Sequence, residues 1–337
     1  MTEKSNNEIN PATIRRHADA AMNAFAMLAG MQLDVFTPLK NGPMSAEALA
    51  NSLDVQVIKL RPLLYSLVMA DLLIVDNGIF SNTDEANRFL VTSSPDYMGG
   101  WVSDFYSRRW NAVLQTAKTI RKGEPQAKLD FEALDEDKLF KLFSGYHPGA
   151  VAAGKELAKL YDFTGFKKLM DAGGGIGGLA IGLCESYQNL KGTIVDLADV
   201  MSISKQFISE AHMSDRINVI ATDLIDSQPE GTYDVAVLRA LIQTLSPDQA
   251  KSVLENIGKA LEPGGSIYIL GYVIDDTHLR PSAFVHWNLH FLNIYDDGRA
   301  FTESEHREWL TDAGFSNISI EYETMPSSLS IVSACKV

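Results

Sequence analysis

A cluster of glycines in the middle of the chain is the feature whose residue types point most directly to chemistry. The stretch 171–178 reads Asp-Ala-Gly-Gly-Gly-Ile-Gly-Gly, and it follows the apolar pair Leu169-Met170 and precedes a helical pattern of apolar residues. Glycines let the backbone turn sharply and approach a ligand without a Cβ atom in the way. The helix after the turn directs free N–H groups toward that ligand. This order of strand, tight turn and helix predicts a site for a nucleotide-type cofactor.

The spacing within the glycine cluster fits more than one cofactor. Gly173, Gly175 and Gly178 match the G-x-G-x-x-G fingerprint of dinucleotide-binding folds. Asp196 ends the next strand-like run and is placed to hold a pair of ribose hydroxyls. An ordinary glycine-rich turn is the alternative, but the strand before it, the helix after it and the acid beyond it argue against that. Dinucleotides and S-adenosylmethionine (SAM) both remain open on spacing alone.

Three further features favour SAM. Asp171 stands at the end of its strand, where it can face the amino-acid end of the cofactor. Asp223 follows the strand-like run 218–221, where an adenine edge would lie. The chain closes with two alternating runs, 318–322 and 329–335, joined by a turn at 325–328. A hairpin at the far end of a parallel sheet is typical of SAM-dependent methyltransferases.

Composition narrows the class of protein and its surroundings. The 337 residues carry a formal net charge of −14, which argues against partners such as nucleic acid or anionic membranes. The two cysteines, Cys184 and Cys335, form no disulfide framework and no metal-ligand spacing with histidines. We therefore expect free thiols, no bound metal and a cytoplasmic location. The polar first ten residues do not resemble a signal peptide, and no segment reaches the ~18 apolar residues that span a bilayer.

The N-terminal part has the pattern of a winged helix. Helical spacing covers 14–30 and 56–70, and Ser45 is a suitable N-cap for a helix at 45–50. Asn77-Gly78 is a strong hairpin signal between two short strand-like runs. Because the chain is acidic, we interpret this part as a dimerisation domain and lid rather than a DNA-binding domain. We place it at 1–99, followed by a helical linker and pocket lid at 100–160 and a SAM-binding catalytic domain at 161–337.

The remaining elements follow from periodicity. One long helix is expected over about 100–122, and two more at 139–143 and 150–160, on either side of an interruption at 145–149. Beyond residue 161, strands and helices alternate as βαβ units do. The predicted fold class is therefore α/β, with a Rossmann-like SAM methyltransferase sheet, a C-terminal antiparallel hairpin, and a mainly helical N-terminal winged-helix dimerisation domain. Strands are expected near 168–172, 192–196, 217–221, 233–238, 266–272, 317–323 and 329–336.

These motifs, in this order, resemble the SAM-dependent O-methyltransferases of the caffeate and acetylserotonin type, including their bacterial branch. The resemblance covers nearly the whole chain, from the N-terminal pattern through 123–125, 161–163, 171–178, 233–235, 263–265, 298–302 and 313–315. It implies a homodimer with intertwined N-terminal domains. It also implies that SAM lies over the glycine loop, with the ribose on Asp196 and the adenine beside the segment after 221. The cofactor set it implies is Asp171, Gly173, Gly174, Gly175, Asp196, Leu197, Asp223, Leu224 and Arg239.

The chain departs from this family at the position of the general base. The family has a histidine after the fourth strand, in a His-Asp-Trp type stretch, whereas this chain has Gln243 there and Leu245 in place of the tryptophan. An amide does not accept a proton at working pH. Methylation of a hydroxyl needs the loss of a proton, which a base accelerates by ~10²–10⁴. Either another base substitutes, or the acceptor has no proton to lose, as is true of a thioether sulfur.

Candidate acceptor-binding residues come from three segments that the resemblance brings to the acceptor pocket. Tyr146 and His147 lie in the interrupted segment, and His147 is the alternative base if the acceptor is a hydroxyl. A loop whose Tyr and His merely pack is the competing interpretation. On the long helix, Tyr106 and Arg109 share a face with Trp110, although packing or solvation explains them equally well. Trp287 and His290 lie on an unusually polar and aromatic helix.

Together these features predict a dimeric methyltransferase acting on a small acceptor, with Gln243, Tyr146 and His147 in the catalytic set. The favoured reaction is S-methylation of a thioether acid such as 4-methylthio-2-hydroxybutyrate without a general base. In this respect the chain is similar to the bacterial methylthiohydroxybutyrate S-methyltransferases of dimethylsulfoniopropionate synthesis. Two alternatives stay open: O-methylation of a phenolic, polyketide or pigment hydroxyl with His147 or His290 as base, and a SAM-binding scaffold without catalysis.

Overall fold

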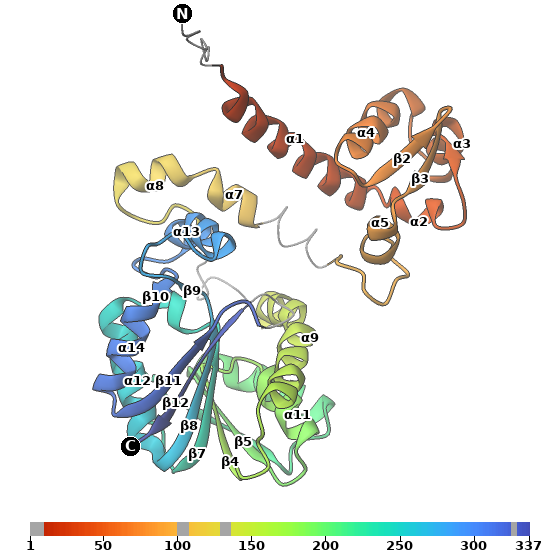
Figure 1. Cartoon of the computed structure of the whole chain (residues 1–337). Helices are drawn as coiled ribbons and strands as arrows, with labels where there is room; N and C mark the ends of the chain where they lie inside the picture. Colours follow the sequence, from red (N-terminus) through yellow and green to blue (C-terminus); the bar gives the residue numbers. More distant parts are fainter. Residues whose placement is uncertain (1–9, 100–107, 129–135, 325–328) are drawn as a thin grey trace, which may run out of the picture. The chain divides into compact units, whose positions relative to one another are not determined.

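The computed structural model describes residues 10–99, 108–128, 136–324 and 329–337, which divide into two compact units, Met1–Asn111 and Ala112–Val337. Figure 1 shows both. This division leaves the predicted boundaries at 99/100 and 160/161 as predictions. Each unit has its own apolar core and is described by itself.

The first unit packs short helices against a small antiparallel sheet with the strand order β1-β3-β2. Ser45 caps α3 by accepting a hydrogen bond from the Ala48 N–H at 3.2 Å, as the sequence predicts. Asn77 and Gly78 both have positive φ, +49° and +80°, which is the backbone that a tight hairpin turn requires. The elements are α1 (Ala12–Gln32), α2 (Phe36–Leu39), β1 (Met44–Ser45), α3 (Ala46–Ser52), α4 (Val57–Met69), β2 (Leu73–Asp76), β3 (Ile79–Asn82) and α5 (Asp84–Phe89).

The helix expected over 100–122 differs from the one in the structure. Residues 100–107 lie outside the described residues, and two short helices follow, α7 (Trp110–Val113) and α8 (Thr116–Lys122). The Thr116 hydroxyl donates to the Val113 carbonyl at 2.6 Å, a local bond that competes with the helical ladder. Gly123, in the left-handed conformation, ends α8. The single long helix was therefore a wrong prediction for the part that the structure describes.

The second unit is built on a sheet of seven strands with the order β11-β12-β8-β7-β4-β5-β6. Strands β4 to β8 are parallel, and β12 runs antiparallel to both β8 and β11. This confirms the Rossmann-like sheet with its closing hairpin, although the turn at 325–328 lies outside the described residues. The strands are β4 (Lys168–Ala172), β5 (Lys191–Asp196), β6 (Ile217–Ala221), β7 (Tyr233–Arg239), β8 (Leu261–Gly271), β11 (Phe315–Glu321) and β12 (Ser330–Lys336).

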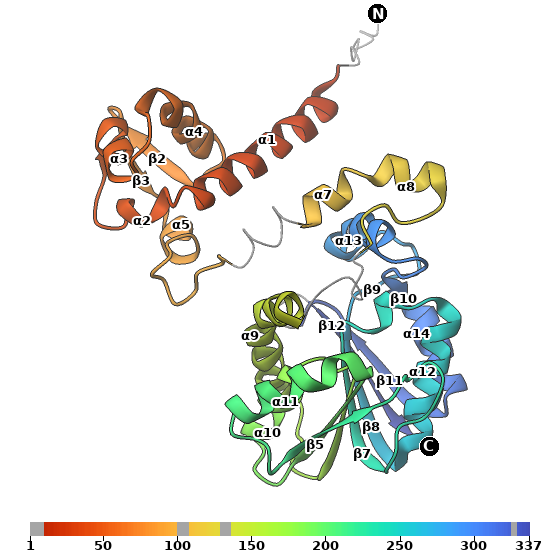
Figure 2. The ribbon, with the colours of Figure 1, turned by 180° about the vertical axis from the view of Figure 1, so that it is seen from behind.

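Helices cover both faces of this sheet, as Figures 1 and 2 show from opposite sides. Alternate strand residues explain the two layers. Met170 and its in-phase neighbours pack under α12 and α14, whereas Leu169 and its neighbours pack under α9, α10 and α11. The helices are α9 (Glu136–Leu160), α10 (Gly178–Ser186), α11 (Met201–Glu210), α12 (Pro247–Ala260), α13 (Ser282–Ile294) and α14 (Glu303–Asp312), with 3-10 turns η2 (Ala198–Val200) and η3 (Ile242–Thr244).

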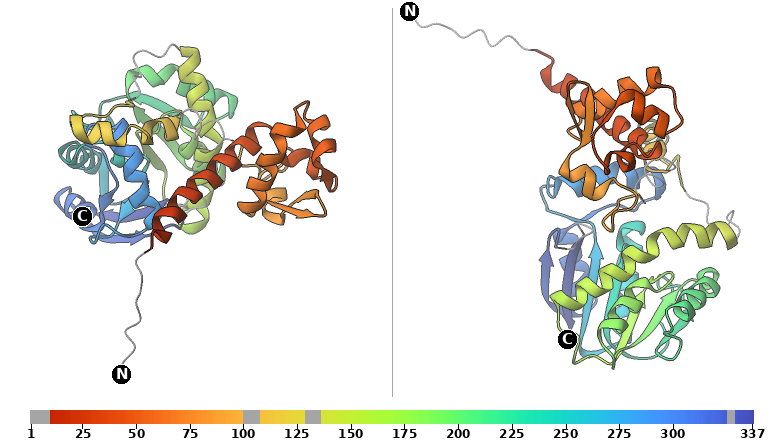
Figure 3. Two further views of the ribbon diagram at one scale, coloured as in Figure 1. Left: turned by 90° about the horizontal axis from the view of Figure 1, so that it is seen from above. Right: turned by 90° about the vertical axis from the view of Figure 1, so that its right-hand side faces the viewer.

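Helix α9 runs without the interruption predicted at 145–149, although Pro148 lies inside it. Figure 3 shows this long helix lying on the same side of the sheet as α11. A proline removes one helical hydrogen bond, so the helix must gain stability elsewhere. It does so against α10, where a Cβ atom on Gly182 would stand 2.3 Å from the Val151 carbonyl oxygen. The two helix backbones thus touch, and this packing keeps the proline-containing turn helical.

Two small elements lie beyond the carboxyl ends of the parallel strands. β9 (Val273–Ile274) pairs in parallel with β10 (Phe301–Thr302), and helix α13 connects them. The buried Asn293 side chain fixes α8 to α13: its amide donates to the Thr116 hydroxyl at 2.9 Å and its oxygen accepts from the Thr119 hydroxyl at 2.6 Å. Helix α13 therefore has a firm support on the side where the sheet's strands end.

Candidate active site

Several predicted site residues meet at the carboxyl edge of the parallel strands. Asp171 lies near the end of β4, Asp196 ends β5, Arg239 ends β7 and Gly271 ends β8. The strands that carry them are neighbours in the sheet. Ligands of open α/β sheets bind at this edge, where loops after adjacent strands diverge. The fold thus brings together residues that are up to 100 positions apart in the sequence.

The glycine loop needs its glycines for both conformation and space. Gly173 and Gly175 have φ of +63° and +54°, a region that favours glycine. The Gly173 N–H donates to the Val195 carbonyl at 2.8 Å, which ties the loop to β5. A Cβ on Gly174 would stand 2.6 Å from the Asp171 carboxyl carbon, and one on Gly177 would stand 2.2 Å from Ile194. The loop is therefore a close-fitting turn that leads directly into α10.

Asp171 is a fully buried carboxyl group whose hydrogen bonds are half satisfied. Its Oδ2 accepts from the Ala180 N–H in the first turn of α10 at 3.0 Å. Its Oδ1 is buried and has no hydrogen-bond partner among the described residues. Burial, opposed by that one backbone bond, raises the pKa of Asp171 to about 7. A buried acceptor without a donor indicates that a ligand group belongs there.

Arg239 supplies the opposite charge at the same edge. Its Nε is buried without a hydrogen-bond partner among the described residues, and burial lowers the pKa of its guanidinium. Tyr272 and Asp171 are the groups whose charge acts on it. Unsatisfied donors of a guanidinium suit a carboxylate. The orphan oxygen of Asp171 and the orphan nitrogen of Arg239 therefore fit the ammonium and carboxylate of an α-amino acid, which is the end group of SAM.

Asp196 and Leu197 sit where β5 ends. The two Asp196 oxygens accept from the N–H groups of Gly175 and Leu197, each at 2.7 Å. Burial raises the pKa of Asp196, and the two backbone bonds oppose that rise. Leu197 is 52% exposed, so its side chain offers apolar surface next to this acid. The arrangement suits a ribose hydroxyl pair with a flat base beside it.

The segment after β6 offers one exposed acid and one buried apolar residue. Asp223 is exposed and accepts from the Ile225 N–H at 2.9 Å through one oxygen, so its second oxygen is available. Leu224 is buried, and its carbonyl accepts from the Asn256 amide at 2.9 Å. An amino group of adenine is the kind of donor that Asp223 can bind.

Gln243 occupies the position of the expected base and is nearly inaccessible, with 4% of its surface exposed. It lies in η3, directly after β7, and its side chain points toward the end of β8. A Cβ on Gly271 would stand 3.6 Å from the Gln243 Oε1, so the position facing this amide has no side chain. Neither position supplies an imidazole or a carboxylate to accept a proton.

Tyr146 and His147 lie in the middle of α9, not in a loop as predicted. Tyr146 is 39% exposed. The His147 ring packs against Phe207 of α11, with centroids 4.5 Å apart, and burial lowers its pKa. Its Nδ1 is buried without a hydrogen-bond partner among the described residues. His147 is therefore neutral at neutral pH and held by aromatic packing beside the glycine loop, since its carbonyl would lie 3.2 Å from a Cβ on Gly178.

An aromatic cluster on α13 adjoins the ends of β7 and β8. Trp287 and His290 contact each other edge to face, with centroids 5.6 Å apart. Tyr272, one residue beyond β8, contacts Trp287 at 5.2 Å and also acts electrostatically on Arg239. Our sequence reasoning missed Tyr272 because it counted that residue as part of a strand. Its place directly after a parallel strand was the signal that could have identified it.

The predicted segment with Tyr106, Arg109 and Trp110 contributes less to the candidate site than the other two segments do. Tyr106 lies outside the described residues. Arg109 lies in the first unit, in a short π-helical turn before α7, and is half-buried. Trp110 packs against Phe25 of α1 with centroids 4.6 Å apart at 87°, which supports the packing interpretation for that ring. Tyr106 and Arg109 therefore remain predictions as acceptor contacts.

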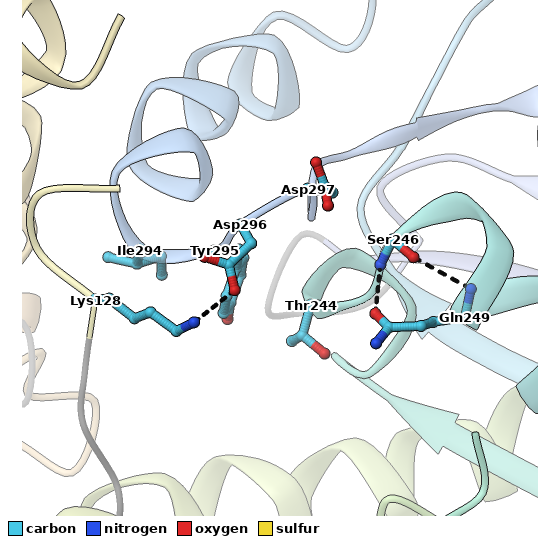
Figure 4. Close-up of a pocket in the computed structure, with 8 residues that line it drawn as sticks. All are labelled: Lys128, Thr244, Ser246, Gln249, Ile294, Tyr295, Asp296 and Asp297. Carbon is cyan, nitrogen blue, oxygen red and sulfur yellow. Dashed lines mark hydrogen bonds and ion pairs between the residues drawn. The ribbon is translucent and has the colours of Figure 1, made fainter. Parts of the chain in front are cut away.

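A cavity of about 220 Å³ is lined in part by Thr244, the residue that follows Gln243. Figure 4 shows its lining. Lys128 and Asp296 form an ion pair across it, and Ser246 and Gln249 form the capping box of α12. The glycine loop takes no part in this cavity. Its lining consists of Lys128, Thr244, Ser246, Gln249, Ile294, Tyr295, Asp296 and Asp297.

No group of three or more His, Cys, Asp or Glu side chains is arranged to hold a metal ion among the described residues. Within the same residues we find no helix whose length and apolar character would let it cross a bilayer.

Comparison with known proteins gives matches along most of the chain. The model of the O-methyltransferase domain matches residues 123–316, and that of the O-methyltransferase dimerisation domain matches 15–92. The chain is 27% identical over 315 residues to the 3-hydroxy-5-methyl-1-naphthoate 3-O-methyltransferase of Streptomyces sahachiroi, covering 92% of this chain and 91% of that protein. It is 24% identical over 303 residues to the N,N-dimethyltransferase OxyT of Streptomyces rimosus, covering 87% of each.

A similar fold is seen in human N-acetylserotonin methyltransferase, solved in complex with SAM. The TM-score is 0.77 at 21% identity, over 99% of both chains. The methyltransferase model alone spans more than half of this chain. The chain therefore belongs to the O-methyltransferase family, and it is a SAM-dependent enzyme whose methyl donor is SAM.

Proposed function

We propose that this enzyme methylates a small acceptor at a thioether sulfur, with a thioether acid such as 4-methylthio-2-hydroxybutyrate as the substrate class. The observation that carries the proposal is Gln243, buried where a base is expected and facing Gly271. A sulfur lone pair is nucleophilic at neutral pH and carries no proton to remove. An acceptor of this kind makes a base unnecessary, so positioning and exclusion of water provide the rate enhancement.

Charge complementarity would hold the cofactor in the site. SAM, when bound, supplies an electrophilic methyl group on a positively charged sulfur. Asp171 and Arg239 would hold its amino-acid end, because each has an orphan buried atom of the matching character. Asp196 would hold the ribose, and Leu197, Asp223 and Leu224 would surround the adenine. These residues would fix the cofactor at both ends, and its methyl group would then be available to an acceptor held beside it.

On the acceptor side, Gln243 acts as a neutral hydrogen-bonding group. Its amide can donate to an acceptor's carboxylate or hydroxyl without changing its own charge. The names of the relatives are not limited to oxygen acceptors. OxyT, for example, is named as an N,N-dimethyltransferase. A change of acceptor atom within the same fold is thus compatible with the comparisons. We keep Tyr106, Arg109, Tyr146, Trp287 and His290 as proposed acceptor contacts.

The proposal is tested by measuring S-adenosylhomocysteine release with a panel of thioether acids, phenols and amines. Thioether acids should react, and phenols should not. The variant Gln243→His should not speed thioether turnover, because that reaction has no proton to transfer. The variant Gln243→Leu, which keeps the volume but removes the amide, should raise the KM for an acid acceptor. Turnover of a phenol by the wild type, with no reaction of thioethers, would show that the proposal is wrong.

A second candidate is O-methylation with a histidine base, and the position of His290 favours it. His290 lies on α13 next to the Trp287 ring, whereas His147 lies on α9 with its ring packed against Phe207 of α11. An imidazole base would make turnover fall at acidic pH as the ring becomes protonated. Thioether methylation predicts a kcat that is flat through the same range. The pH profile of kcat, with SAM saturating, separates the two candidates.

We also propose that the enzyme works as a homodimer formed through the first unit. The family's dimerisation model matches 15–92, and α1 leaves large apolar side chains exposed. A contiguous patch of exposed apolar side chains is typical of a protein–protein contact surface. The winged-helix interpretation of the same unit remains part of this proposal. Sedimentation analysis of the wild type and of Phe25→Asp, whose ring is 48% exposed, tests it: the variant should shift toward monomer.

A further inference from the structure

Two aromatic rings, Tyr272 and Trp287, form a corner beside the residues proposed to hold the cofactor's amino-acid end. Tyr272 and Trp287 contact each other with centroids 5.2 Å apart and planes inclined by 48°. Both rings are half-buried, so each keeps accessible surface. Tyr272 borders the core on the side of the sheet that α9 and α10 cover, and both rings pack against a small buried cluster that includes Phe284 and Phe291. Each ring is therefore packed on one side, and the surface that it leaves accessible is suited to a ligand group.

Buried rings behind the corner fix its geometry. Phe284 and Phe291, which are 1% and 3% exposed, contact the Tyr272 ring edge to face at 5.2 and 5.1 Å. Phe291 also stacks on Trp287 at 5.7 Å. The two outer rings are therefore held by packing before any ligand arrives. A preorganised surface loses little conformational entropy when it binds.

The corner is close to the reacting region on two independent grounds. Tyr272 directly follows Gly271, the position that faces the Gln243 amide. The phenol of Tyr272 also acts on the guanidinium of Arg239, which in turn faces Asp171. Tyr272 thus connects the cofactor-holding pair to the wall formed by α13. In our proposal, an acceptor held near Gln243 would therefore have the Tyr272 ring close to it.

We propose that Tyr272 and Trp287 hold the positively charged acceptor sulfur that forms during S-methylation, and this inference rests on the proposed function. In the reaction, the bond between the methyl carbon and the cofactor's sulfur breaks, and its electron pair stays on that sulfur. The acceptor sulfur forms the new bond with its own lone pair. No proton moves, and one positive charge passes from the cofactor to the acceptor.

A ring face attracts a cation through its quadrupole, most strongly for tryptophan. The aromatic corner therefore stabilises the charge where it develops, on the acceptor side, and not where it starts. An O-methylated product is neutral and gains nothing from such a surface. This makes the corner a determinant of specificity for sulfur as the acceptor atom. The nearby positive charge of Arg239 is offset by Asp171 and, in our proposal, by the cofactor's carboxylate.

The test uses the full chain with S-adenosylhomocysteine bound and measures binding of tetramethylammonium by calorimetry. The neutral isostere tert-butanol is the comparison ligand. Trp287→Leu should weaken tetramethylammonium binding by at least about fivefold, the loss expected for one cation–π contact. It should leave tert-butanol binding and S-adenosylhomocysteine affinity unchanged. Trp287→Phe, which keeps a ring, should retain most of the binding of the cation.

Leu289→Ala is the matched control, because Leu289 is on the same helix and is 43% exposed without belonging to the corner. It should bind tetramethylammonium like the wild type. Tyr272→Leu should repeat the Trp287→Leu result, and Tyr272→Phe should keep the cation bound. Unchanged thermal unfolding shows that a loss of binding is not a loss of folding.

The outcomes separate the two proposals. If thioethers are methylated but tetramethylammonium binds no better than tert-butanol, or binds Trp287→Leu as well as the wild type, the aromatic corner does not have this role and the S-methylation proposal stands. If the ring-dependent preference for the cation is found but only phenols are methylated, the corner is a cation site and the proposed reaction is wrong. Ring-dependent binding together with a fall in kcat/KM for thioethers in Trp287→Leu supports both.

Discussion

The backbone N–H of Gly175 donates to Oδ2 of Asp196 at 2.7 Å, so the glycine loop is fastened to the end of the neighbouring strand before a cofactor binds. The other oxygen of Asp196 accepts from the Leu197 N–H at the same distance. A carboxylate is required for this pair of bonds, because both oxygens face donors. The acid that is proposed to hold the ribose also shapes the loop that holds the rest of the cofactor.

Asp196→Asn should therefore be a severe change despite its similar size. One end of the new amide is an NH₂ group, which would meet an N–H donor and lose one buried hydrogen bond, a cost of about 1–3 kcal/mol. We expect S-adenosylhomocysteine to bind about 100-fold more weakly, and the apo protein to unfold at a lower temperature. Asp223→Asn is the matched control, because one Asp223 oxygen accepts from the Ile225 N–H and an amide oxygen can replace it.

Asp223→Asn should leave the apo stability unchanged and weaken S-adenosylhomocysteine by less than about tenfold, the loss of one exposed hydrogen bond. Calorimetry and thermal unfolding measure both quantities. Equal effects of the two substitutions on apo stability would contradict the role given to the Gly175 bond.

The contact between α9 and α10 should be intolerant of even one added methyl group. Gly182→Ala would place a Cβ 2.3 Å from the Val151 carbonyl oxygen, so the helices must separate. Overpacking of this kind costs about 1–3 kcal/mol of unfolding free energy. Gly145→Ala on α9 is the control, because no atom lies within 4 Å of its Cβ position. There the better helix propensity should stabilise the protein by about 0.5–1 kcal/mol.

Urea denaturation of the two glycine variants gives the sign of each change directly. If Gly145→Ala also destabilises the protein, the continuous helix described through Pro148 is not the conformation present in solution.

Sequence periodicity predicted the sheet well because each strand has a clear apolar pattern and a clear boundary. The strand expected at 168–172 and the one at 217–221 match β4 and β6 residue for residue. Helix α9 was harder, because Gly145, Pro148 and Gly149 disfavour a helix locally and only its packing against α10 keeps it continuous. Local propensity does not contain that tertiary contact.

The site shows the same division between local and long-range information. Asp171 and Asp196 were identified because a glycine loop and a strand end mark them in the sequence. Tyr272 was missed because the sequence pattern counted it as part of a strand, and its interactions with Arg239 and Trp287 exist only in the folded chain. The state of Asp171 was also hidden, since its raised pKa depends on how deeply the finished fold buries it.

Arg239 should contribute to cofactor binding mainly through the cofactor's carboxylate. Arg239→Met removes the guanidinium while keeping an apolar chain in the half-buried site, and we expect S-adenosylhomocysteine to bind about 10–100-fold more weakly, as for a charged hydrogen bond of about 1.5–3 kcal/mol. Decarboxylated S-adenosylhomocysteine should bind the wild type and this variant equally. A double-mutant cycle over the two ligands measures the coupling, and a coupling near zero would place the carboxylate elsewhere.

Asp171 should make the stability of the apo protein depend on pH in a defined direction. In the folded protein its carboxyl keeps a proton up to about pH 7, whereas the unfolded chain loses it near the ordinary value of 3.8. Between these values the folded state binds more protons, so the free energy of unfolding falls as pH rises from about 4 to about 7. Above pH 7 this contribution is constant, and ionising the buried group has cost about 4 kcal/mol.

Asp171→Asn should remove this cost, because an amide is neutral at every pH and its oxygen can still accept from the Ala180 N–H. We expect the variant to be about 1–3 kcal/mol more stable than the wild type at pH 8 and no more stable at pH 4, with the buried amide hydrogens limiting the gain. Urea denaturation at the two pH values measures this. The same variant should bind S-adenosylhomocysteine more weakly, because it cannot offer a carboxylate to the ammonium group. A variant that loses stability at pH 8 would show that Asp171 is not held there as a strained buried carboxylate.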